Sequence, residues 1–322
     1  MHHYPMMILA DIGGTHARFA QLNGEEITHV DKYKAADYGS FEDAMRAYYA
    51  SSGAAHSTPI YIATAAYPDH EDIWRFVNRN KWAIDPQALN KAGWKITHIL
   101  NDFEAAAWAL ADIDNSARHV IQKGVNNTEH PLCLLGPGTG LGLAYFMPGQ
   151  SSYVQKTHGG HMLATCISPE QRDVTTAIQR LYDMNSPLVF EQLVSGPGLL
   201  NIYNAVLSLS GEDKLATKTQ EVLAAIDTEH AQNGVRLFHE FLGLFVHNVV
   251  TTGHAYGGVY LTGGVTQRLH EAGLFDAAAF HKFFLPGNVA SVQSALENTP
   301  IHIVSDPYLT LSGLRSMLAR QS

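Results

Sequence analysis

Short apolar runs separated by a glycine turn organise the start of the chain. Residues 6–10 and 17–22 form apolar runs of strand length, and the stretch between them, 11–16, contains two adjacent glycines. This spacing predicts two strands joined by a turn, with residues 27–33 as a third strand. The chain is therefore expected to begin with a β-meander whose first turn is rich in glycine.

Helical spacing replaces the strand pattern further along. Apolar residues recur every three or four positions from Phe41 to Tyr49, directly after Ser40, a favoured helix N-cap. Two more apolar runs, 60–65 and 96–100, predict strands, and the second leads straight into Asn101-Asp102 and an alanine-rich helix. Asp102 is thus expected where a strand ends and a helix begins.

The first meander has a near copy in the middle of the chain. Leu9–Ala20 overlays Cys133–Ala144 at a constant offset, so that Gly14-Thr15 matches Gly138-Thr139. A repeated unit of strand, glycine turn and strand predicts a duplicated α/β architecture, with one phosphate loop from each half facing a ligand cleft. Chance similarity around Gly-Thr is the alternative.

The second half of the chain continues the alternation of helices and strands. Periodicity and caps predict helices at 196–209, 236–250 and 309–320, a strand ending in a Gly-Gly turn within 258–265, and a strand at 301–304. The helix at 236–250 is apolar around nearly its whole circumference, so it is expected to be buried.

Composition is that of a folded protein of about two domains. The 322 residues are 46% hydrophobic and 16% charged, which excludes a peptide-sized module and extended disorder. A net charge of -9 without blocks of like charge argues against a nucleic-acid surface. Eighteen histidines would carry the formal charge to +9 if all were protonated, so solubility should change at mildly acidic pH.

Targeting and membrane signals are not recognisable in the sequence. It shows neither a secretory signal nor a run of about 20 apolar residues, and its two cysteines cannot form a disulfide framework. We expect a cytoplasmic protein with no nucleic-acid or membrane partner.

Three glycine turns each follow a predicted strand: Gly13-Gly14-Thr15, Gly136–Gly140 and Gly263-Gly264. Backbone N–H groups in such turns can approach phosphates without interference from a Cβ. Each turn alone is equally well a tight turn, but the three together indicate a nucleotide. Neither the P-loop pattern nor the dinucleotide fingerprint occurs, which disfavours P-loop NTPases and dehydrogenases.

Two carboxylates are expected at strand ends, where α/β proteins bind ligands. Asp102 is either a general base or an ordinary helix N-cap. Asp11 either holds Mg²⁺ through water or satisfies donors of the following turn, and its position favours the metal.

A histidine pair is spaced by two glycines in His158-Gly-Gly-His161. With only Cys166 nearby and no second ligand pair, the spacing is poor evidence for zinc. Hydrogen bonds from a close-packed loop to a small ligand fit the glycines better. Glu191, just before the predicted helix start at Ser195, could reach the same ligand or be an ordinary exposed glutamate.

Taken together, these motifs closely resemble the bacterial glucokinase family, a branch of the actin-like ATPase superfamily. The similarity covers almost the whole chain, in the order Asp11–Arg18, Asn101–Ala105, Gly136–Gly142, Gly159–His161, Glu191 with Ser195–Gly198, and Leu261–Gly264. It implies a duplicated actin-like ATPase (ribonuclease H-like) fold with two domains flanking a ligand cleft. The small α/β domain would comprise 1–112 plus 305–322, and the large α/β domain 113–304.

The resemblance also implies ATP-dependent phosphorylation of glucose at its 6-hydroxyl, with Asp102 accepting the proton as that oxygen attacks the γ-phosphate. The implied sugar-binding residues are Asn101, His158, His161 and Glu191. The implied ATP-binding residues are Ala10, Asp11, Ile12, Gly13, Gly14, Thr15, Arg18, Gly138, Thr139, Gly140, Gly263 and Gly264. Mg²⁺ would accompany ATP and contact Asp11 through water, and a homodimer is also implied.

Two positions depart from the family pattern, which usually has Glu where this chain has His158 and Asn where it has His16. An imidazole accepts at most one hydrogen bond where a carboxylate accepts two. Losing a buried hydrogen bond costs ~1–3 kcal/mol, so sugar binding is expected to be about 5- to 150-fold weaker, or altered in preference. The alternatives are a kinase for another hexose or amino sugar, and a catalytically weak sugar-sensing regulatory protein. Retention of Asp102 argues against the sensor.

Overall fold

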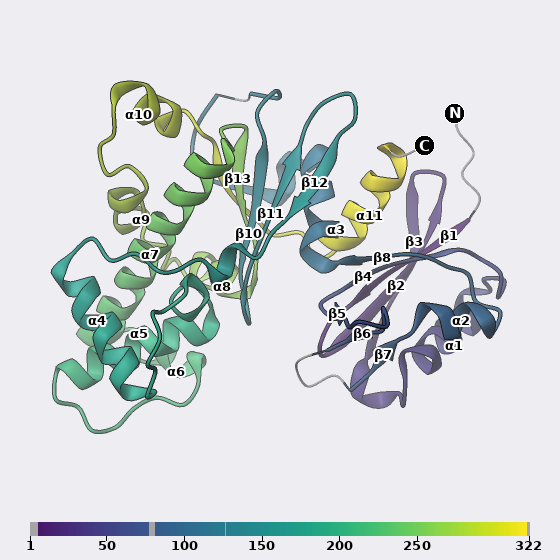
Figure 1. Ribbon diagram of the computed structural model, residues 1–322, viewed down its shortest axis with the longest axis horizontal. Helices are drawn as coiled ribbons and strands as arrows, with labels where there is room; N and C mark the ends of the chain where they lie inside the picture. The colour runs from purple at the N-terminus through teal and green to yellow at the C-terminus, as the bar shows by residue number, and fades with distance from the viewer. Residues whose placement is uncertain (1–5, 77–80, 126, 321–322) are drawn as a thin grey trace. The chain divides into compact units, whose positions relative to one another are not determined.

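The computed structural model describes residues 6–76, 81–125 and 127–320. The chain separates into two compact units (Figure 1). Unit 1 comprises Met1–Ile113 together with Asp306–Ser322, and unit 2 comprises Asp114–Ser305. The chain therefore leaves unit 1, builds unit 2, and returns to complete unit 1.

Unit 1 is built on a five-stranded mixed sheet in the order β3-β2-β1-β4-β8. Its strands are β1 (Met7–Ile12), β2 (His16–Asn23), β3 (Glu26–Lys34), β4 (Ile60–Thr64) and β8 (Ile96–Asn101). The meander β1-β2-β3 is antiparallel, whereas β1, β4 and β8 run parallel. The predicted meander and both later strands are confirmed.

The first strand is longer than its sequence pattern indicated. We expected Asp11 in the turn, but β1 continues to Ile12, so the turn is only Gly13–Thr15. Asp11 lies opposite Arg18 in the antiparallel register, and the two side chains form an ion pair at 2.8 Å. Because Ile12 is also fully buried, both residues gain by remaining in the strand.

Helices cover both faces of this sheet (Figure 1). On one face lies α1 (Phe41–Ser52), capped as predicted by Ser40, whose side chain accepts from the Asp43 N–H. Tyr48 of α1 stacks on Phe19 of β2 with ring centroids 5.2 Å apart. The other face carries α3 (Asp102–Trp108) and α11 (Leu309–Arg320), which pack against each other. The remaining elements of unit 1 are α2 (Pro86–Lys91) and a small sheet of β5 (Tyr67–Pro68), β6 (Trp74–Arg75) and β7 (Ala83–Ile84).

Unit 2 contains a six-stranded mixed sheet in the order β12-β11-β10-β13-β14-β9. Its strands are β9 (Arg118–Gln122), β10 (Leu132–Pro137), β11 (Leu141–Met147), β12 (Tyr153–Lys156), β13 (Gly258–Leu261) and β14 (Ile301–Val304). Here β12-β11-β10 is antiparallel and β10-β13-β14 is parallel. The strands β12-β11-β10-β13-β14 thus repeat the order and directions of β3-β2-β1-β4-β8 in unit 1, and β9 is added at the edge beside β14.

A long buried helix organises the core of unit 2. The predicted helix at 236–250 is confirmed as the central part of α7 (Glu229–Gly253), whose phenylalanines are fully buried. Helices α5 and α9 pack along it. The helices of this unit are α4 (Pro169–Leu181), α5 (Gly196–Leu209), α6 (Thr219–Ala224), α7, α8 (Gly264–Glu271), α9 (Ala277–Phe284) and α10 (Ala290–Glu297). Within the described ranges, no helix is both long and apolar enough to cross a bilayer.

Close packing of α11 on α3 generates a prediction for stability. A Cβ on Gly313 of α11 would lie 1.8 Å from the Ala105 carbonyl oxygen, so Gly313→Ala must push the two helices apart. We expect a loss of about 1–3 kcal/mol in the free energy of unfolding, as for other overpacked sites. All four tryptophans of the chain lie in unit 1, so tryptophan fluorescence during urea unfolding reports on this unit.

The matched control for this variant is Gly234→Ala in α7. Its added Cβ would meet only ordinary contacts, at 3.5 Å or more from Tyr203. Its fluorescence transition should coincide with that of the unchanged protein. Equal urea midpoints for Gly313→Ala and this control would contradict the packing argument.

Candidate active site

The carboxyl ends of three parallel strands meet at one edge of the sheet in unit 1. The register places Ile12 of β1 beside Thr64 of β4, and Thr64 beside Asn101 of β8. Asp11 and Asp102, which adjoin Ile12 and Asn101, are therefore brought to the same edge. Such edges are where open α/β sheets bind ligands.

The start of α3 shows how Asn101 and Asp102 share the capping of this helix. Asn101 is the N-cap, and its Oδ1 accepts from the Phe103 N–H at 3.0 Å. Asp102 is the first residue of the helix, and its own Oδ1 also accepts from the Phe103 N–H, at 2.8 Å. The N-cap position is thus taken by the residue before Asp102, and one carboxylate oxygen of Asp102 makes no bond to this N–H.

Burial is the main influence on the ionisation of this pair. It raises the pKa of Asp102 to about 6, with a further upward contribution from the charge of Asp11, while the Phe103 N–H acts in the opposite direction. Burial also raises the pKa of Asp11, although the Arg18 guanidinium beside it favours the charged form. A carboxyl with a pKa near neutrality can both accept and release a proton at physiological pH.

Thr64 is a member of this edge that the sequence analysis did not assign to the site. It is fully buried at the end of β4, and its hydroxyl oxygen accepts from the Ala66 N–H at 3.1 Å. Its position as the last residue of a predicted strand was the available signal. Without the strand order, nothing in the sequence placed β4 between β1 and β8.

Basic residues line the strands next to the first glycine turn. In the β2-β3 register, His16 pairs with Lys34 and Arg18 with Lys32. Burial lowers the pKa of His16, and the surrounding charges of Lys32, Arg18 and Lys34 lower it further. The lowered pKa favours the neutral form of His16, and the neighbouring Lys32 and Lys34 add positive charge that favours an anionic ligand.

The first two glycine turns retain unused backbone donors. The N–H groups of Gly13 and Gly138 close their own turns by donating to His16 and Gly140 carbonyl oxygens, respectively. Within the described residues, the N–H groups of Gly14, Thr15, Thr139 and Gly140 donate no hydrogen bond. Their chemistry fits phosphate oxygens, which accept from such donors.

Glycines at the predicted nucleotide positions fall into two groups. A Cβ on Gly13, Gly138 or Gly264 would meet nothing closer than 3.4 Å, so the packing of the described chain does not require glycine there. Gly263, in contrast, has φ +93°, and a Cβ on it would lie 2.5 Å from the Pro137 carbonyl oxygen. The first group leaves space that a ligand can use, whereas Gly263 is needed by the fold.

Unit 2 holds Glu191 against the second glycine turn. The Leu141 N–H donates to Glu191 Oε2 at 2.8 Å. Ser195 caps α5 as predicted, accepting from the Gly198 N–H, and its hydroxyl donates to the Glu191 carbonyl oxygen. Glu191 is thus partly buried and fixed at two points, which excludes the alternative of an ordinary exposed glutamate.

The histidine pair lies on a short turn of 3₁₀ helix, Gly159–His161, packed on β11. Both histidine side chains are exposed, with ring centroids 6.4 Å apart. The glycines are required by packing, because a Cβ on Gly160 would lie 2.2 Å from the Leu141 carbonyl oxygen. The loop thus presents two imidazoles from a backbone held tightly against the sheet.

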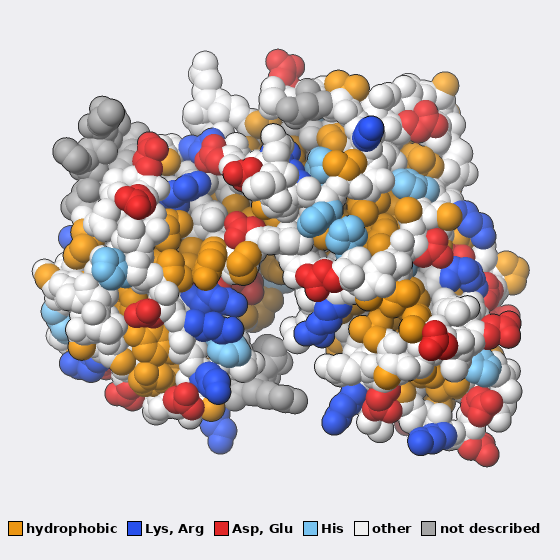
Figure 2. Space-filling model, turned by 180° about the vertical axis from the view of Figure 1, so that it is seen from behind, with side chains coloured by type: hydrophobic (Ala, Val, Ile, Leu, Met, Phe, Trp, Pro, Cys, Tyr) orange, Lys and Arg blue, Asp and Glu red, His pale blue; other side chains and the backbone are white. Residues whose placement is uncertain are grey.

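Other histidines of the described residues lie on elements away from this loop. Figure 2 shows histidine side chains at separate places on one face of the molecule, and pairs such as His119 with His270 lie on different elements. His239 is fully buried, and burial lowers its pKa to about 4. It will therefore stay neutral in mild acid.

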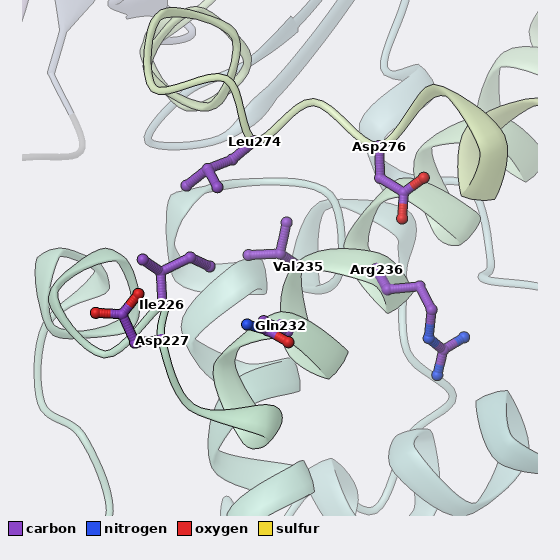
Figure 3. Close-up of a pocket in the computed structure, with 7 residues that line it drawn as sticks. All are labelled: Ile226, Asp227, Gln232, Val235, Arg236, Leu274 and Asp276. Carbon is purple, nitrogen blue, oxygen red and sulfur yellow. The ribbon is translucent and has the colours of Figure 1, made fainter.

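A cavity of about 360 Å³ lies elsewhere in unit 2, between the end of α6, the start of α7 and the α8–α9 connection. Figure 3 shows Ile226, Val235 and Leu274 around it, while the Arg236 guanidinium extends away. Arg236 is paired there with Glu170 at 2.6 Å. None of the predicted site residues lines this cavity.

Comparison with known proteins assigns the chain to one family. The family model described as Glucokinase matches residues 8–321. The chain belongs to the glucokinase family. It is 31% identical over 313 residues to a glucokinase of Pseudomonas aeruginosa, covering 95% of this chain and 92% of that protein.

The chain is also similar to longer relatives in sequence and to a solved structure in fold. The chain is 30% identical to the bifunctional protein glk of Burkholderia orbicola over 98% of its own length, but it spans only 48% of that relative, about half. The crystal structure of a glucokinase from an Antarctic psychrotroph superposes with a TM-score of 0.86, at 22% identity, covering 98% of this chain and 99% of that one. The glucokinase fold is therefore shared over nearly the whole chain.

Ionisation of Asp102 generates a prediction that requires no substrate. Because its pKa is raised from 3.8 to about 6, the charged carboxylate destabilises the folded state, by up to about 3 kcal/mol above pH 6. Asp102→Asn should remove this cost, so the variant should be more stable at pH 8. The gain should shrink as the pH falls from 6 and disappear below about pH 4, where the carboxyl is protonated in both the folded and unfolded states.

Urea unfolding of both proteins between pH 4 and pH 8, followed by tryptophan fluorescence, measures this difference. Asp69→Asn is the control in the same unit, because a hydrogen bond from the Arg75 side chain lowers the pKa of that carboxyl. It should give no gain at any pH. A difference between Asp102→Asn and the unchanged protein that is the same at pH 4 and pH 8 would contradict the assignment of a raised pKa.

Proposed function

We propose that this protein transfers the γ-phosphoryl group of ATP to the 6-hydroxyl of glucose, with Asp102 as the general base. The observation that carries the proposal is the Asp102 carboxylate at the strand edge beside Asp11, with a pKa of about 6, in a chain of the glucokinase family. A base must be ionised yet able to take up a proton, and a pKa near the working pH meets both needs.

Sugar binding is assigned to residues of both units. Asn101 adjoins the base, and its amide nitrogen is directed by an oxygen already engaged in capping α3. In unit 2, His161 and Glu191 offer an imidazole and a free carboxylate oxygen, and His158 stands next to His161. Hydrogen bonds from these groups would orient the sugar so that one hydroxyl faces the phosphate.

Nucleotide binding is assigned to the glycine turns. The free N–H groups of Gly14, Thr15, Thr139 and Gly140 would donate to phosphate oxygens, and the open space at Gly13, Gly138 and Gly264 admits close approach. Ala10, Ile12 and Gly263 support these turns from buried or constrained positions. Arg18 would add positive charge near the phosphates, in addition to its pairing with Asp11.

The residues present also fit a magnesium ion brought with ATP. Asp11 uses only Oδ2 for Arg18, so Oδ1 remains able to accept from a metal-bound water. Mg²⁺ is commonly held by one or two carboxylates and the substrate phosphates, and it supplies neutralisation of the charge developing on them. In this chain, Asp11 would hold the water, Arg18 would orient Asp11, and Asp102 would hold the proton.

The finer description of the fold is part of the same proposal. We assign a duplicated actin-like ATPase (ribonuclease H-like) architecture, supported by the shared strand order and directions of the two sheets. The small domain would be 1–112 plus 305–322 and the large domain 113–304, close to the bounds of the two units. A cytoplasmic location and a homodimer remain predictions.

A different sugar is the second candidate, and the exposed His158 beside His161 favours it. An imidazole in place of a carboxylate changes the hydrogen bonds offered to a ring hydroxyl. A kinase for another hexose or an amino sugar would keep the same base and the same nucleotide turns. A sugar sensor without turnover has less support, because it would not need a base with a pKa of about 6.

The test is phosphorylation of glucose, mannose, fructose, glucosamine and N-acetylglucosamine by the full chain with ATP and Mg²⁺. We expect saturable glucose turnover, and a kcat reduced about 10²- to 10⁴-fold in Asp102→Asn, as for loss of other general bases. Gly234→Ala is the matched control and should behave as the unchanged protein. Turnover of another sugar alone would assign preference to that sugar, and sugar binding without any turnover would contradict the kinase.

The pH profile tests the role of Asp102 separately. Because the base works only when ionised, kcat/KM for the sugar should fall about tenfold per unit as the pH drops below 6, the pKa of Asp102. The residual activity of Asp102→Asn should lack this limb. A limb that is identical in the variant would show that another group titrates.

A further inference from the structure

The glycine at position 140 has a neighbour that explains it without a phosphate. A Cβ on Gly140 would lie 2.6 Å from Glu191 Oε2, and non-bonded atoms do not approach a real Cβ so closely. The φ of Gly140 lies outside the left-handed region, so the turn itself does not demand glycine. The carboxylate of Glu191 thus occupies the place of the missing side chain.

This position gives the carboxylate a fixed partner. With glycine at 140, Oε2 of Glu191 reaches the Leu141 N–H at 2.8 Å. The backbone of Glu191 is held independently, since the buried Ser195 hydroxyl donates to its carbonyl oxygen at 2.6 Å. Within the described residues Oε1 accepts no hydrogen bond, so one oxygen is anchored and the other remains available.

Leu141 also fixes the histidine loop. A Cβ on Gly160 would lie 2.2 Å from the Leu141 carbonyl oxygen, so the loop packs directly against this oxygen. A hydrogen bond from the His161 N–H to the His158 carbonyl oxygen closes the loop. The N–H of Leu141 therefore positions Glu191, while its carbonyl side positions the loop that carries His161. One residue directly after the glycine turn thus contacts both Glu191, through its N–H, and the histidine loop, through its carbonyl oxygen.

We propose that Gly140 is a positioning residue of the sugar site, which admits the Glu191 carboxylate onto the Leu141 N–H, and this rests on the proposed function. Sequence reasoning assigned Gly140 to the nucleotide. In the structure the Glu191 carboxylate occupies the space that a Cβ on Gly140 would fill. The Gly140 N–H donates no hydrogen bond within the described residues. The second glycine turn would thus serve the sugar through the missing Cβ of Gly140, and the nucleotide through the N–H groups of Thr139 and Gly140 and the space beside Gly138.

Substituting Gly140 separates its effect on the sugar from its effect on the nucleotide. In Gly140→Ala the new Cβ must displace the carboxylate from the Leu141 N–H, so Oε1 loses its fixed direction. We expect KM for the sugar to rise roughly 10- to 100-fold, the range for loss of a hydrogen bond to a charged group. KM for ATP should change less than about threefold, because the free donors stay in place.

The decisive experiment is a double-mutant cycle with Glu191→Ala, measured as KM for the sugar and KM for ATP. Because Gly140→Ala acts through the carboxylate, the double variant should bind sugar no worse than Glu191→Ala alone. Gly138→Ala, whose Cβ meets no atom closer than 4.0 Å, should raise KM for ATP instead, and Gly234→Ala should change neither. Additive effects on the sugar, or a rise confined to KM for ATP in Gly140→Ala, would overturn the proposal.

A thermal cycle separates this inference from the proposed function. Gly140→Ala should lower the melting temperature by about 2–4 °C with Glu191 present and leave it unchanged in the Glu191→Ala background, whether or not any sugar binds. If no hexose is phosphorylated but this coupling appears, the proposed function fails and the positioning contact stands. If the thermal effects are additive, the positioning role fails whatever the activity.

Discussion

Unit 1 depends on keeping two acidic side chains close together and largely out of water. Asp11 and Asp102 reach the same edge because β1, β4 and β8 run parallel and end together. Separated carboxylates would ionise readily, and a buried pair resists this. Arg18 stabilises the charge of Asp11, and the Phe103 N–H stabilises that of Asp102. The fold therefore tolerates the pair, although the pKa of Asp102 stays raised. The sheet order, the ion pair and the first turn of α3 all serve this arrangement.

Most of the regular structure followed from local patterns. The helices at Phe41, Gly196 and Leu309 and the buried centre of α7 were predicted, because apolar spacing and caps are local properties. One miss was local, because α4 begins with a capping box of Ser168 and Gln171 that the sequence analysis did not use. Other errors arose where distant residues decide the outcome. Asp11 belongs to β1 because Arg18 pairs with it across the hairpin, and the two-residue strands β5–β7 are too short to leave a pattern in the sequence.

Local sequence patterns predicted candidate residues for the site as they predicted the elements of the fold. Strand ends and glycine turns pointed to Asp102, Asp11 and the phosphate turns, and the His-Gly-Gly-His spacing pointed to the histidine loop and Glu191. The family resemblance gave these residues their roles, which stay predictions. Glycines with different roles could not be told apart, since Gly13 and Gly263 look alike in the sequence. They differ in what a Cβ would meet, which is an ordinary contact with the His16 carbonyl oxygen at Gly13 and a clash with the Pro137 carbonyl oxygen at Gly263. They also differ in backbone conformation, because only Gly263 has a positive φ.

The return of the chain to unit 1 affects the order in which the protein can fold. Helix α11 packs so tightly on α3 that Gly313 touches the Ala105 carbonyl, yet it follows the whole of unit 2 in the sequence. During synthesis on the ribosome, unit 2 can complete its core while one face of the first sheet still lacks its covering helix. The nascent chain therefore exposes an apolar surface next to α3 until α11 emerges, and such transiently exposed surface is prone to associate with other chains.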